Sequence, residues 1–134
     1  MTGPLRKDVF TQIARFAAVG GVGFMVDGGL LWFLLSADLS PYLARALSFP
    51  AAVLTTWVLN RNWTFAVPEG ASRRAELRRY FTVQVVGNLT NYGIYSGILA
   101  LFGTASVTVF VAFAIGSFVG SCLNFIGARV YAFR

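Results

Sequence analysis

The chain has 134 residues, of which 57% are hydrophobic and only 12% are charged. Charged residues make up about a quarter of an ordinary soluble domain, so the composition excludes that class and favours a single membrane domain. The net charge is +6, with no histidine and one cysteine, Cys122. A chain with one cysteine cannot form an internal disulfide, and no cluster of residues has metal-ligand spacing. We therefore expect no enzymatic activity, no cofactor and no metal.

Four apolar stretches follow one another along the chain, at residues 16–35, 42–59, 80–102 and 104–128. The first contains Asp27 as its only charge, the second has Arg45 near one end, and the other two carry no charge. Each stretch is close to the ~20 residues that an α-helix needs to cross a hydrocarbon core of about 30 Å. The sequence therefore predicts an all-α, multi-pass membrane protein with four transmembrane helices.

The second half of the chain resembles the first. Arg15 and Gly23 correspond to Arg79 and Gly87, each 64 residues later, and the offset grows to 68 toward the ends of the two copies. Two similar halves around a pseudo-two-fold axis are typical of small transporters. We predict one domain over residues 10–134, made of two repeated helical hairpins at 15–65 and 79–133 with a cytoplasmic loop at 66–78.

The basic residues predict the orientation of these spans. Ten of the eleven lie before the first span, between the second and third, or after the fourth, and only Arg45 lies on the other side. Because positive charge is retained in the cytoplasm, we expect the N- and C-termini and the central loop to be cytoplasmic. The arginines are spread along a membrane edge, so the net charge does not indicate nucleic-acid binding.

A set of motifs runs through the two copies in a fixed order. The motifs are Arg15-Phe-x-x-Val-Gly-Gly, then Asp27, then Asn60-Arg-x-Trp-x-Phe65, and at the end Asn124-Phe-x-x-x-Arg129-x-Tyr131-x-Phe133. Together they resemble the GtrA-like family of small four-span membrane proteins. The two copies differ at two of these positions, where Ala128 replaces Asn60 and Thr56 replaces Asn124, so the halves are not equivalent.

The resemblance implies a role with polyprenyl-phosphate-linked sugars in the bacterial inner (plasma) membrane. The family is associated with cell-surface polysaccharide synthesis and O-antigen modification, through translocation of these lipids or service to the glycosyltransferases that use them. We therefore expect binding and flipping of a polyprenyl-phosphate-linked sugar. One alternative is an accessory subunit that recruits or anchors a glycosyltransferase without transporting anything. A second alternative is a small multidrug exporter, which the strong charge bias argues against.

Asp27 is the first candidate substrate-binding residue. It lies twelve residues beyond Arg15, or about 18 Å along a helix at ~1.5 Å per residue, near the bilayer middle. An ionised carboxylate there costs on the order of 2.5–3.5 kcal/mol, so we expect it to face protein or a water-filled cavity. It would either accept hydrogen bonds from sugar hydroxyls or couple to protons, or it would pack between helices and pair with Arg45 or an asparagine.

The third span carries a polar stripe. The residues Gln84, Asn88, Asn91 and Tyr95 share one helix face, and Asn91 occupies the repeat position of Asp27. Lipid does not solvate amide side chains, so we expect the stripe to point into the bundle or into an oligomer interface. Cross-helix hydrogen bonds would explain it, and so would a track for a sugar-phosphate head.

Arginines and asparagines gather at the predicted cytoplasmic rim. The candidate binding residues there are Arg15, Asn60, Arg61, Trp63, Arg79, Asn124 and Arg129. A guanidinium fork suits bidentate binding of a phosphate, although topology and anchoring to lipid headgroups would also place arginines at this level.

Small residues predict close helix packing at Gly116-x-x-x-Gly120 and Gly93-x-x-x-Gly97. Four short helices enclose little volume, so we also expect a homo-oligomer. The other partners that we expect are the membrane, the lipid-linked sugar and a membrane glycosyltransferase.

Overall fold

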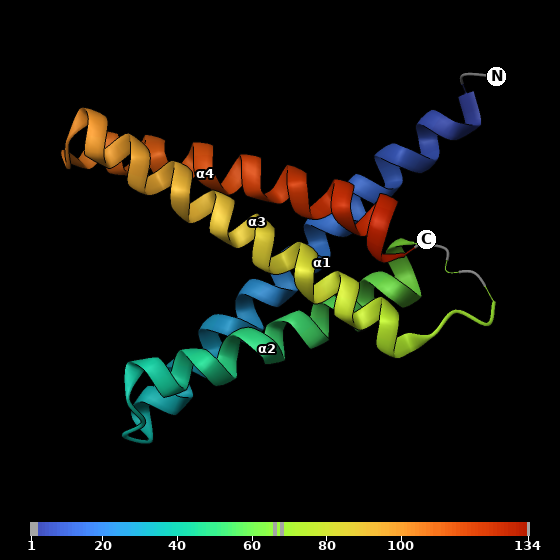
Figure 1. Cartoon of the computed structure of the whole chain (residues 1–134), viewed down its shortest axis with the longest axis horizontal. Helices are drawn as coiled ribbons and strands as arrows, with labels where there is room; N and C mark the ends of the chain where they lie inside the picture. Colours follow the sequence, from blue (N-terminus) through green and yellow to red (C-terminus); the bar gives the residue numbers. More distant parts are fainter. Residues whose placement is uncertain (1–2, 66, 68, 134) are drawn as a thin grey trace. The chain divides into compact units, whose positions relative to one another are not determined.

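The computed structural model of the chain describes residues 3–65, 67 and 69–133. Nearly all of this part is helical (Figure 1). The elements are α1 (Gly3–Ser36), α2 (Pro41–Leu59), η1 (Asn60–Thr64), α3 (Arg73–Phe102), α4 (Ser106–Gly127) and η2 (Ala128–Ala132), of which η1 and η2 are π-helices. No strand occurs in the described residues, so the predicted all-α class is confirmed. Arg134, and residues 66 and 68 of the predicted loop, lie outside the described residues.

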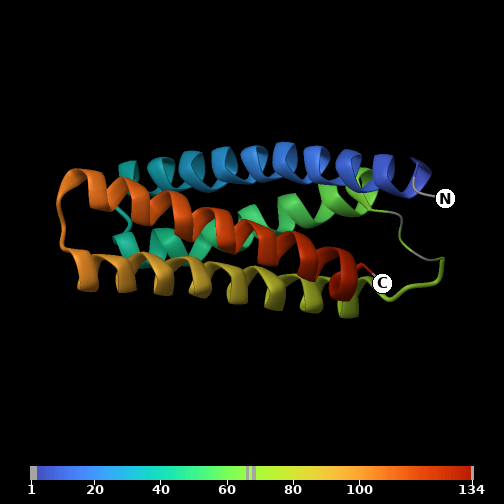
Figure 2. The same ribbon diagram turned by 90° about the horizontal axis from the view of Figure 1, so that it is seen from above.

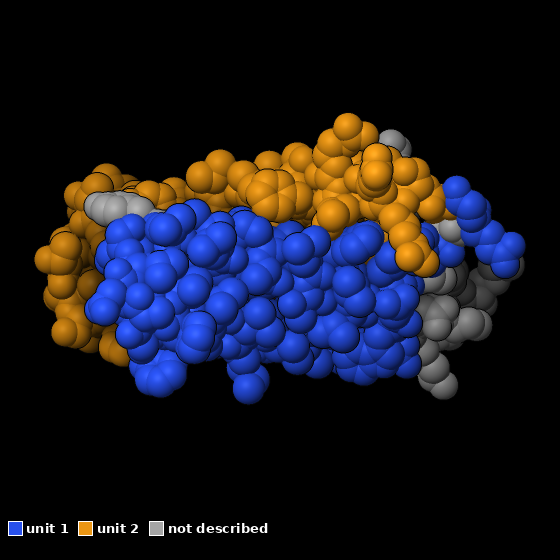
Figure 3. Space-filling model, turned by 90° about the horizontal axis from the view of Figure 1, so that it is seen from below, with its two compact units in different colours: residues 1–70 blue, residues 71–134 orange. Residues whose placement is uncertain are grey.

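The chain divides into two compact units, residues 1–70 and 71–134 (Figure 3). In unit 1, α1 packs against α2 and η1, and in unit 2, α3 packs against α4 and η2. The two long helices of each unit run antiparallel (Figure 2). Each unit is therefore a helical hairpin that ends in a π-helical turn.

Serine caps determine where the second and third long helices begin. The hydroxyl oxygen of Ser40 accepts a hydrogen bond from the Leu43 amide at 3.2 Å, and that of Ser72 accepts one from the Ala75 amide at 3.4 Å. Such caps satisfy backbone donors that have no partner inside the helix. Because Ser72 is the cap, α3 already includes residues 73–78, which the sequence had predicted as loop.

The surface of the molecule suits a lipid environment. Among the described residues, two helices are long and apolar enough to cross a membrane, Val9–Ser36 and Ser106–Ala132. Several large apolar side chains are more than 70% exposed: Phe24, Met25, Trp32, Leu101 and Phe110. Extensive apolar exposure of this kind is rare in soluble monomers. The count of four spans and the cytoplasmic termini remain predictions.

Glycines bring α3 and α4 close together in unit 2. A Cβ atom added at Gly120 would lie 2.9 Å from a main-chain oxygen of α3, and one at Gly116 would lie 2.8 Å from the main-chain oxygen of Asn91. Close backbone approach is what this spacing of small residues allows, so the prediction for this pair is confirmed. Within hairpin 2, a Cβ atom at Gly93 or Gly97 would meet nothing within 4 Å, so this pair does not mediate the contact between α3 and α4, and close packing there stays a prediction.

Each hairpin also has a close contact between its own two helices, at equivalent positions of the repeat. In unit 1, a Cβ atom on Gly23 would overlap the side-chain methyl group of Thr56, and in unit 2 one on Gly87 would overlap the side-chain oxygen of Asn124. Both members of each contact occupy matching places in the repeat. The repeat seen in the sequence is therefore also a repeat of packing.

The hairpins differ in length at their turns. Counted from matching repeat positions, α3 continues two residues beyond the end of α1, and α4 begins three residues before the start of α2. The growth of the repeat offset from 64 to 68 therefore comes from additional helix at the turn of hairpin 2.

Candidate functional site

Each hairpin ends in a π-helical turn at the same place in the repeat. The Phe65 amide donates to the carbonyl oxygen of Asn60 at 2.9 Å, and the Phe133 amide donates to that of Ala128, also at 2.9 Å. These bonds span five residues instead of four, which defines a π-helix. Because π-helical turns are rare and occur often at functional sites, this pair of turns is the first part of the candidate site.

An arginine from the first helix of each hairpin satisfies the last carbonyl groups of its π-helix. Arg15 donates from Nη1 to the main-chain oxygen of Trp63 at 2.8 Å. Arg79 donates from Nε to that of Tyr131 at 3.0 Å and from Nη2 to that of Ala132 at 3.1 Å. The final carbonyls of a helix have no donor within it. Both arginines, which the sequence predicted to bind phosphate, thus also stabilise the hairpin ends.

Aromatic pairs support these turns from the neighbouring positions. The rings of Phe16 and Phe65 meet edge to face with centroids 6.2 Å apart, and those of Tyr80 and Phe133 lie 5.5 Å apart at 55°. Aromatic pairs in such geometries contribute about 0.5–1.5 kcal/mol beyond their burial. Each turn is therefore held by an arginine and an adjacent aromatic residue of the facing helix.

The π-helix of the first repeat buries a polar pair that the second repeat lacks. Thr64 donates from its hydroxyl to Oδ1 of Asn60 at 2.8 Å, and the two residues are 5% and 1% exposed. The equivalent residues of η2 are Ala128 and Ala132, both fully buried. A buried amide costs free energy unless it is hydrogen-bonded, so the hydrogen bond from Thr64 offsets part of the cost of burying the Asn60 side chain.

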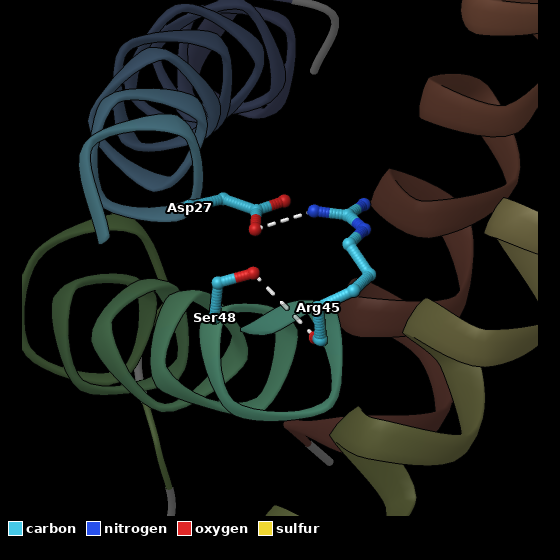
Figure 4. Close-up of polar contacts among 3 residues, drawn as sticks. All are labelled: Asp27, Arg45 and Ser48. Carbon is cyan, nitrogen blue, oxygen red and sulfur yellow. Dashed lines mark hydrogen bonds and ion pairs between the residues drawn. The ribbon is translucent and has the colours of Figure 1, made fainter. Parts of the chain in front are cut away.

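Asp27 forms an ion pair with Arg45 across hairpin 1 (Figure 4). Arg45 Nη1 lies 2.5 Å from Oδ1 of Asp27, and the side chains of Arg45 and Asp27 are 54% and 19% exposed. The guanidinium also lies 5.9 Å from the ring centroid of Phe49. Ser48 is buried one turn further along α2, where its hydroxyl donates to the Arg45 carbonyl oxygen at 3.5 Å. The pairing with Arg45 is one of the two interpretations of Asp27, and a role toward sugar hydroxyls remains a prediction.

The polar stripe of α3 divides between exposed and packed residues. Asn88 is exposed and donates from Nδ2 to the main-chain oxygen of Gln84 at 2.9 Å, within its own helix. Asn91 is half-buried and lies against Gly116 and Gly120 of α4. The structure therefore brings Asn91 to the contact between α3 and α4, while the Asn88 amide bonds along α3.

The remaining predicted residues lie on or beside the π-helices. Trp63 of η1 and Arg129 of η2 are exposed, whereas Arg61 is half-buried. The Arg15 guanidinium lies 5.3 Å from the Trp63 ring centroid, so these two predicted residues are brought together. Asn124 is half-buried, and its Oδ1 atom has no hydrogen-bond partner among the described residues.

Two features of the site were not predicted from the sequence. These are the bonds from Arg15 and Arg79 to π-helical carbonyls and the partnership of Thr64 with Asn60. The motif Arg-x-aromatic-x-Phe recurs at both hairpin ends and marks these segments as related. Composition does not distinguish a π-helical turn from an α-helical one, so the motif did not predict the π-helices or their bonds. In the part of the chain that the structure describes, no three His, Cys, Asp or Glu side chains come close enough to hold a metal ion. The side chains present suit recognition of anions and hydroxyl groups.

Two comparisons with known proteins extend these observations. A family model described as "GtrA/DPMS, transmembrane domain" matches residues 15–133, which include both hairpins and both π-helices. The uncharacterized membrane protein YngA of Bacillus subtilis (strain 168) is 28% identical over 127 residues, which cover 95% of this chain and 82% of that protein.

Proposed function

This chain belongs to the GtrA/DPMS transmembrane-domain family, and we propose that it binds a polyprenyl-phosphate-linked sugar and flips it across the bacterial inner membrane. Family membership supports a membrane role related to polyprenyl-phosphate sugars. The proposal adds translocation for cell-envelope polysaccharide or O-antigen modification, without covalent chemistry. It includes a homo-oligomeric state and a membrane glycosyltransferase as the partner that uses the translocated lipid.

The observation that carries this proposal is the pair of polar residues, Asp27 and Asn91, at matching positions of the two hairpins. Each is half-buried in a helix whose neighbouring residues are mainly apolar. Polar and ionisable groups at membrane depth are costly and commonly mark substrate pathways. Asp27 provides a charged acceptor for sugar hydroxyls and Asn91 provides a neutral donor and acceptor.

The arginines at the hairpin ends supply phosphate recognition in this proposal. Arg15 and Arg79 bind backbone carbonyls through some of their N–H groups, and a guanidinium has five N–H donors in total. In each hairpin the remaining donors of this arginine are available to a lipid phosphate, and the exposed Arg129 adds a further positive charge in hairpin 2. Trp63 lies beside Arg15, where its ring offers a face for stacking on the sugar.

The proposal is tested by a flipping assay in liposomes. The purified protein is reconstituted into vesicles that contain a short-chain polyprenyl-phosphate sugar, and an external glycosidase or oxidant reports the sugar that reaches the outer leaflet. We expect the accessible fraction to exceed one half only in vesicles that contain protein. Cys122 is not among the proposed binding residues. A variant with Cys122 replaced by serine therefore serves as the matched control and is expected to flip the lipid normally.

The opposite result has a clear meaning. Absence of protein-dependent flipping, together with normal copurification of a glycosyltransferase, would overturn the carrier proposal and leave an accessory role. Flipping of a polyprenyl-phosphate sugar but not of a phospholipid of equal charge would tie the activity to the sugar-linked lipid.

A further inference from the structure

The Asp27–Arg45 ion pair occurs in only one of the two repeats. Asn91 stands at the repeat position of Asp27, and the exposed Phe113 stands at that of Arg45. Hairpin 2 packs without an ion pair at these positions, and the contact of Gly23 with Thr56 matches that of Gly87 with Asn124. The ion pair is therefore not part of the packing that the two repeats share, and its place in an apolar hairpin calls for another explanation.

We propose that Arg45 is a receptor for the phosphate of a lipid at the turn end of hairpin 1, with Asp27 as its resting counterion. When the lipid binds, its phosphate replaces the Asp27 carboxylate as the partner of the guanidinium. This inference rests on the proposed function and adds a second phosphate site to it, at the opposite end of the hairpin from Arg15.

The geometry of the pair leaves the guanidinium accessible. A single hydrogen bond joins Arg45 to Asp27, through Nη1 and Oδ1, and the other N–H groups of Arg45 make no hydrogen bond within the described residues. The Arg45 side chain is more than half exposed, whereas the Asp27 side chain is mostly buried. Figure 4 shows the guanidinium at the end of an extended side chain, with the carboxylate on one side of it. A planar fork with unused donors is the arrangement that binds phosphate oxygens in pairs.

An exchange of partners keeps both charged groups satisfied. A buried carboxylate without a partner is strongly unfavourable, so Asp27 releases Arg45 only if other donors replace it. In a polyprenyl-phosphate sugar the hydroxyl donors lie next to the phosphate. The phosphate then occupies Arg45 while the sugar hydroxyls occupy Asp27, and the adjacency of the two side chains matches the adjacency of the two ligand groups.

The position of Arg45 along the hairpin gives the second site its role. Arg45 lies four residues after the start of α2 at Pro41, about 6 Å from the turn at 1.5 Å per residue. Arg15 lies near the other end of the same hairpin, where it binds the Trp63 carbonyl. A phosphate that crosses the membrane therefore has a guanidinium partner at each end of its path.

The test observes Arg45 directly in the full-length protein in detergent. Arginine is labelled with ¹⁵N, the Arg45 side-chain signals are assigned with Arg45→Lys, and three probes are titrated: a short-chain polyprenyl-phosphate sugar, inorganic phosphate and phosphatidylglycerol. We expect a saturable shift of the Arg45 signals with the sugar lipid. Asp27→Asn removes the competing carboxylate, so we expect the sugar lipid to bind Arg45 roughly threefold to tenfold more tightly in that variant. Arg73→Gln, at an exposed arginine outside the site, is the matched control and is expected to leave the affinity unchanged.

The other possible outcomes distinguish failure of the Arg45 site from failure of the proposed transport function. An unchanged Arg45 signal in a protein that flips the lipid would overturn this site and leave the transport proposal standing. A saturable Arg45 response in a protein that fails to flip would overturn transport and support the site. An equal response to inorganic phosphate would assign the site to free phosphate and overturn its assignment to a lipid, and an equal response to phosphatidylglycerol would overturn its preference for the sugar-linked lipid.

Discussion

Arg79 donates a hydrogen bond from Nε to the main-chain oxygen of Tyr131 at 3.0 Å, although 52 residues separate them in the sequence. This bond joins the start of hairpin 2 to its end, and the bond from Arg15 to Trp63 does the same in hairpin 1. In each repeat, therefore, an arginine near the start of the hairpin caps the π-helical turn at its end.

Lysine at position 79 is expected to destabilise the protein more than lysine at position 15. Arg79 reaches two carbonyl oxygens and Arg15 reaches one, and an ammonium group cannot reproduce the fork. Hydrogen bonds from charged groups contribute about 1.5–3 kcal/mol each, so Arg79→Lys should lower the melting temperature in detergent measurably while membrane insertion stays intact. Both variants should also bind lipid phosphate less tightly. An unchanged melting temperature and unchanged binding in both would reduce these arginines to topology signals.

Removal of the Thr64 hydroxyl should destabilise the end of hairpin 1. Thr64→Val keeps the size of the side chain but removes the hydroxyl that donates to Oδ1 of Asn60. A buried acceptor that loses its partner costs about 1–3 kcal/mol. The free energy of unfolding, measured with denaturant in mixed micelles, reports this loss. Thr55→Val, at a half-buried threonine that bonds its own helix at Ala51, is the control and should cost less.

Alanine at Gly120 should disrupt the packing of hairpin 2, whereas alanine at Gly97 should not. The added methyl group at Gly120 meets a backbone oxygen, which cannot move aside without shifting a helix, but at Gly97 it meets nothing within 4 Å. Overpacking typically costs 1–3 kcal/mol, and we expect about that loss for Gly120→Ala. Gly97→Ala should be neutral or slightly stabilising, because alanine favours the helix. Equal stability of the two variants in thermal unfolding would contradict the close approach of α3 and α4.

Asp27→Asn is expected to slow translocation without weakening binding of the lipid. The variant loses the charged acceptor proposed for the sugar hydroxyls, while the proposed phosphate-binding arginines are all kept. Asn91→Ala should have a milder effect, since a neutral amide is lost. The liposome assay gives the flipping rate, and equilibrium binding of the same lipid gives the affinity. A parallel fall in both quantities would show that Asp27 acts in binding alone.

The predicted orientation is tested with single cysteines in a background where Cys122 is replaced by serine. A cysteine at Ser72, or one added after the last residue, should react only with a reagent applied from the cytoplasmic side. A cysteine at Asp38, in the turn between α1 and α2, should react from the outside. Labelling of position 72 from both sides would show dual insertion and favour the exporter interpretation.

Apolar length and the repeated motifs were sufficient to predict the helical class and the family. The close contact at Gly116 and Gly120 also followed from spacing, because the absence of a side chain acts directly on helix distance. The Gly93–Gly97 pair has the same spacing, but an added Cβ atom at either glycine would meet no atom of α4 within 4 Å. Spacing alone does not identify which face of a helix is packed.

The candidate site was only partly predictable for a related reason. The sequence singled out Arg15, Asp27 and Asn60 by charge and position, but it could not distinguish among their partners. Thr64 lies four residues after Asn60, a spacing at which helical side chains are neighbours, but the sequence does not show that both side chains are buried and joined by a hydrogen bond. Arg45 was marked by its isolation among the basic residues, and the ion pair with Asp27 was one of two alternatives for that carboxylate.

The unequal length of the two hairpins has a consequence for the surrounding membrane. With two more residues at the end of α3 and three more at the start of α4, hairpin 2 extends about 3–4.5 Å further than hairpin 1 from matching repeat positions to its turn, at 1.5 Å per residue. Its tip is apolar, with Leu101 and Phe102 exposed, whereas the tip of hairpin 1 contains Ser36 and Asp38. Hydrophobic mismatch costs a fraction of a kcal/mol per Å. On the predicted four-span arrangement, a bilayer of uniform thickness cannot match both hairpins in an upright orientation. We therefore expect the lipid to be compressed beside hairpin 1 or stretched beside hairpin 2, or hairpin 2 to be tilted.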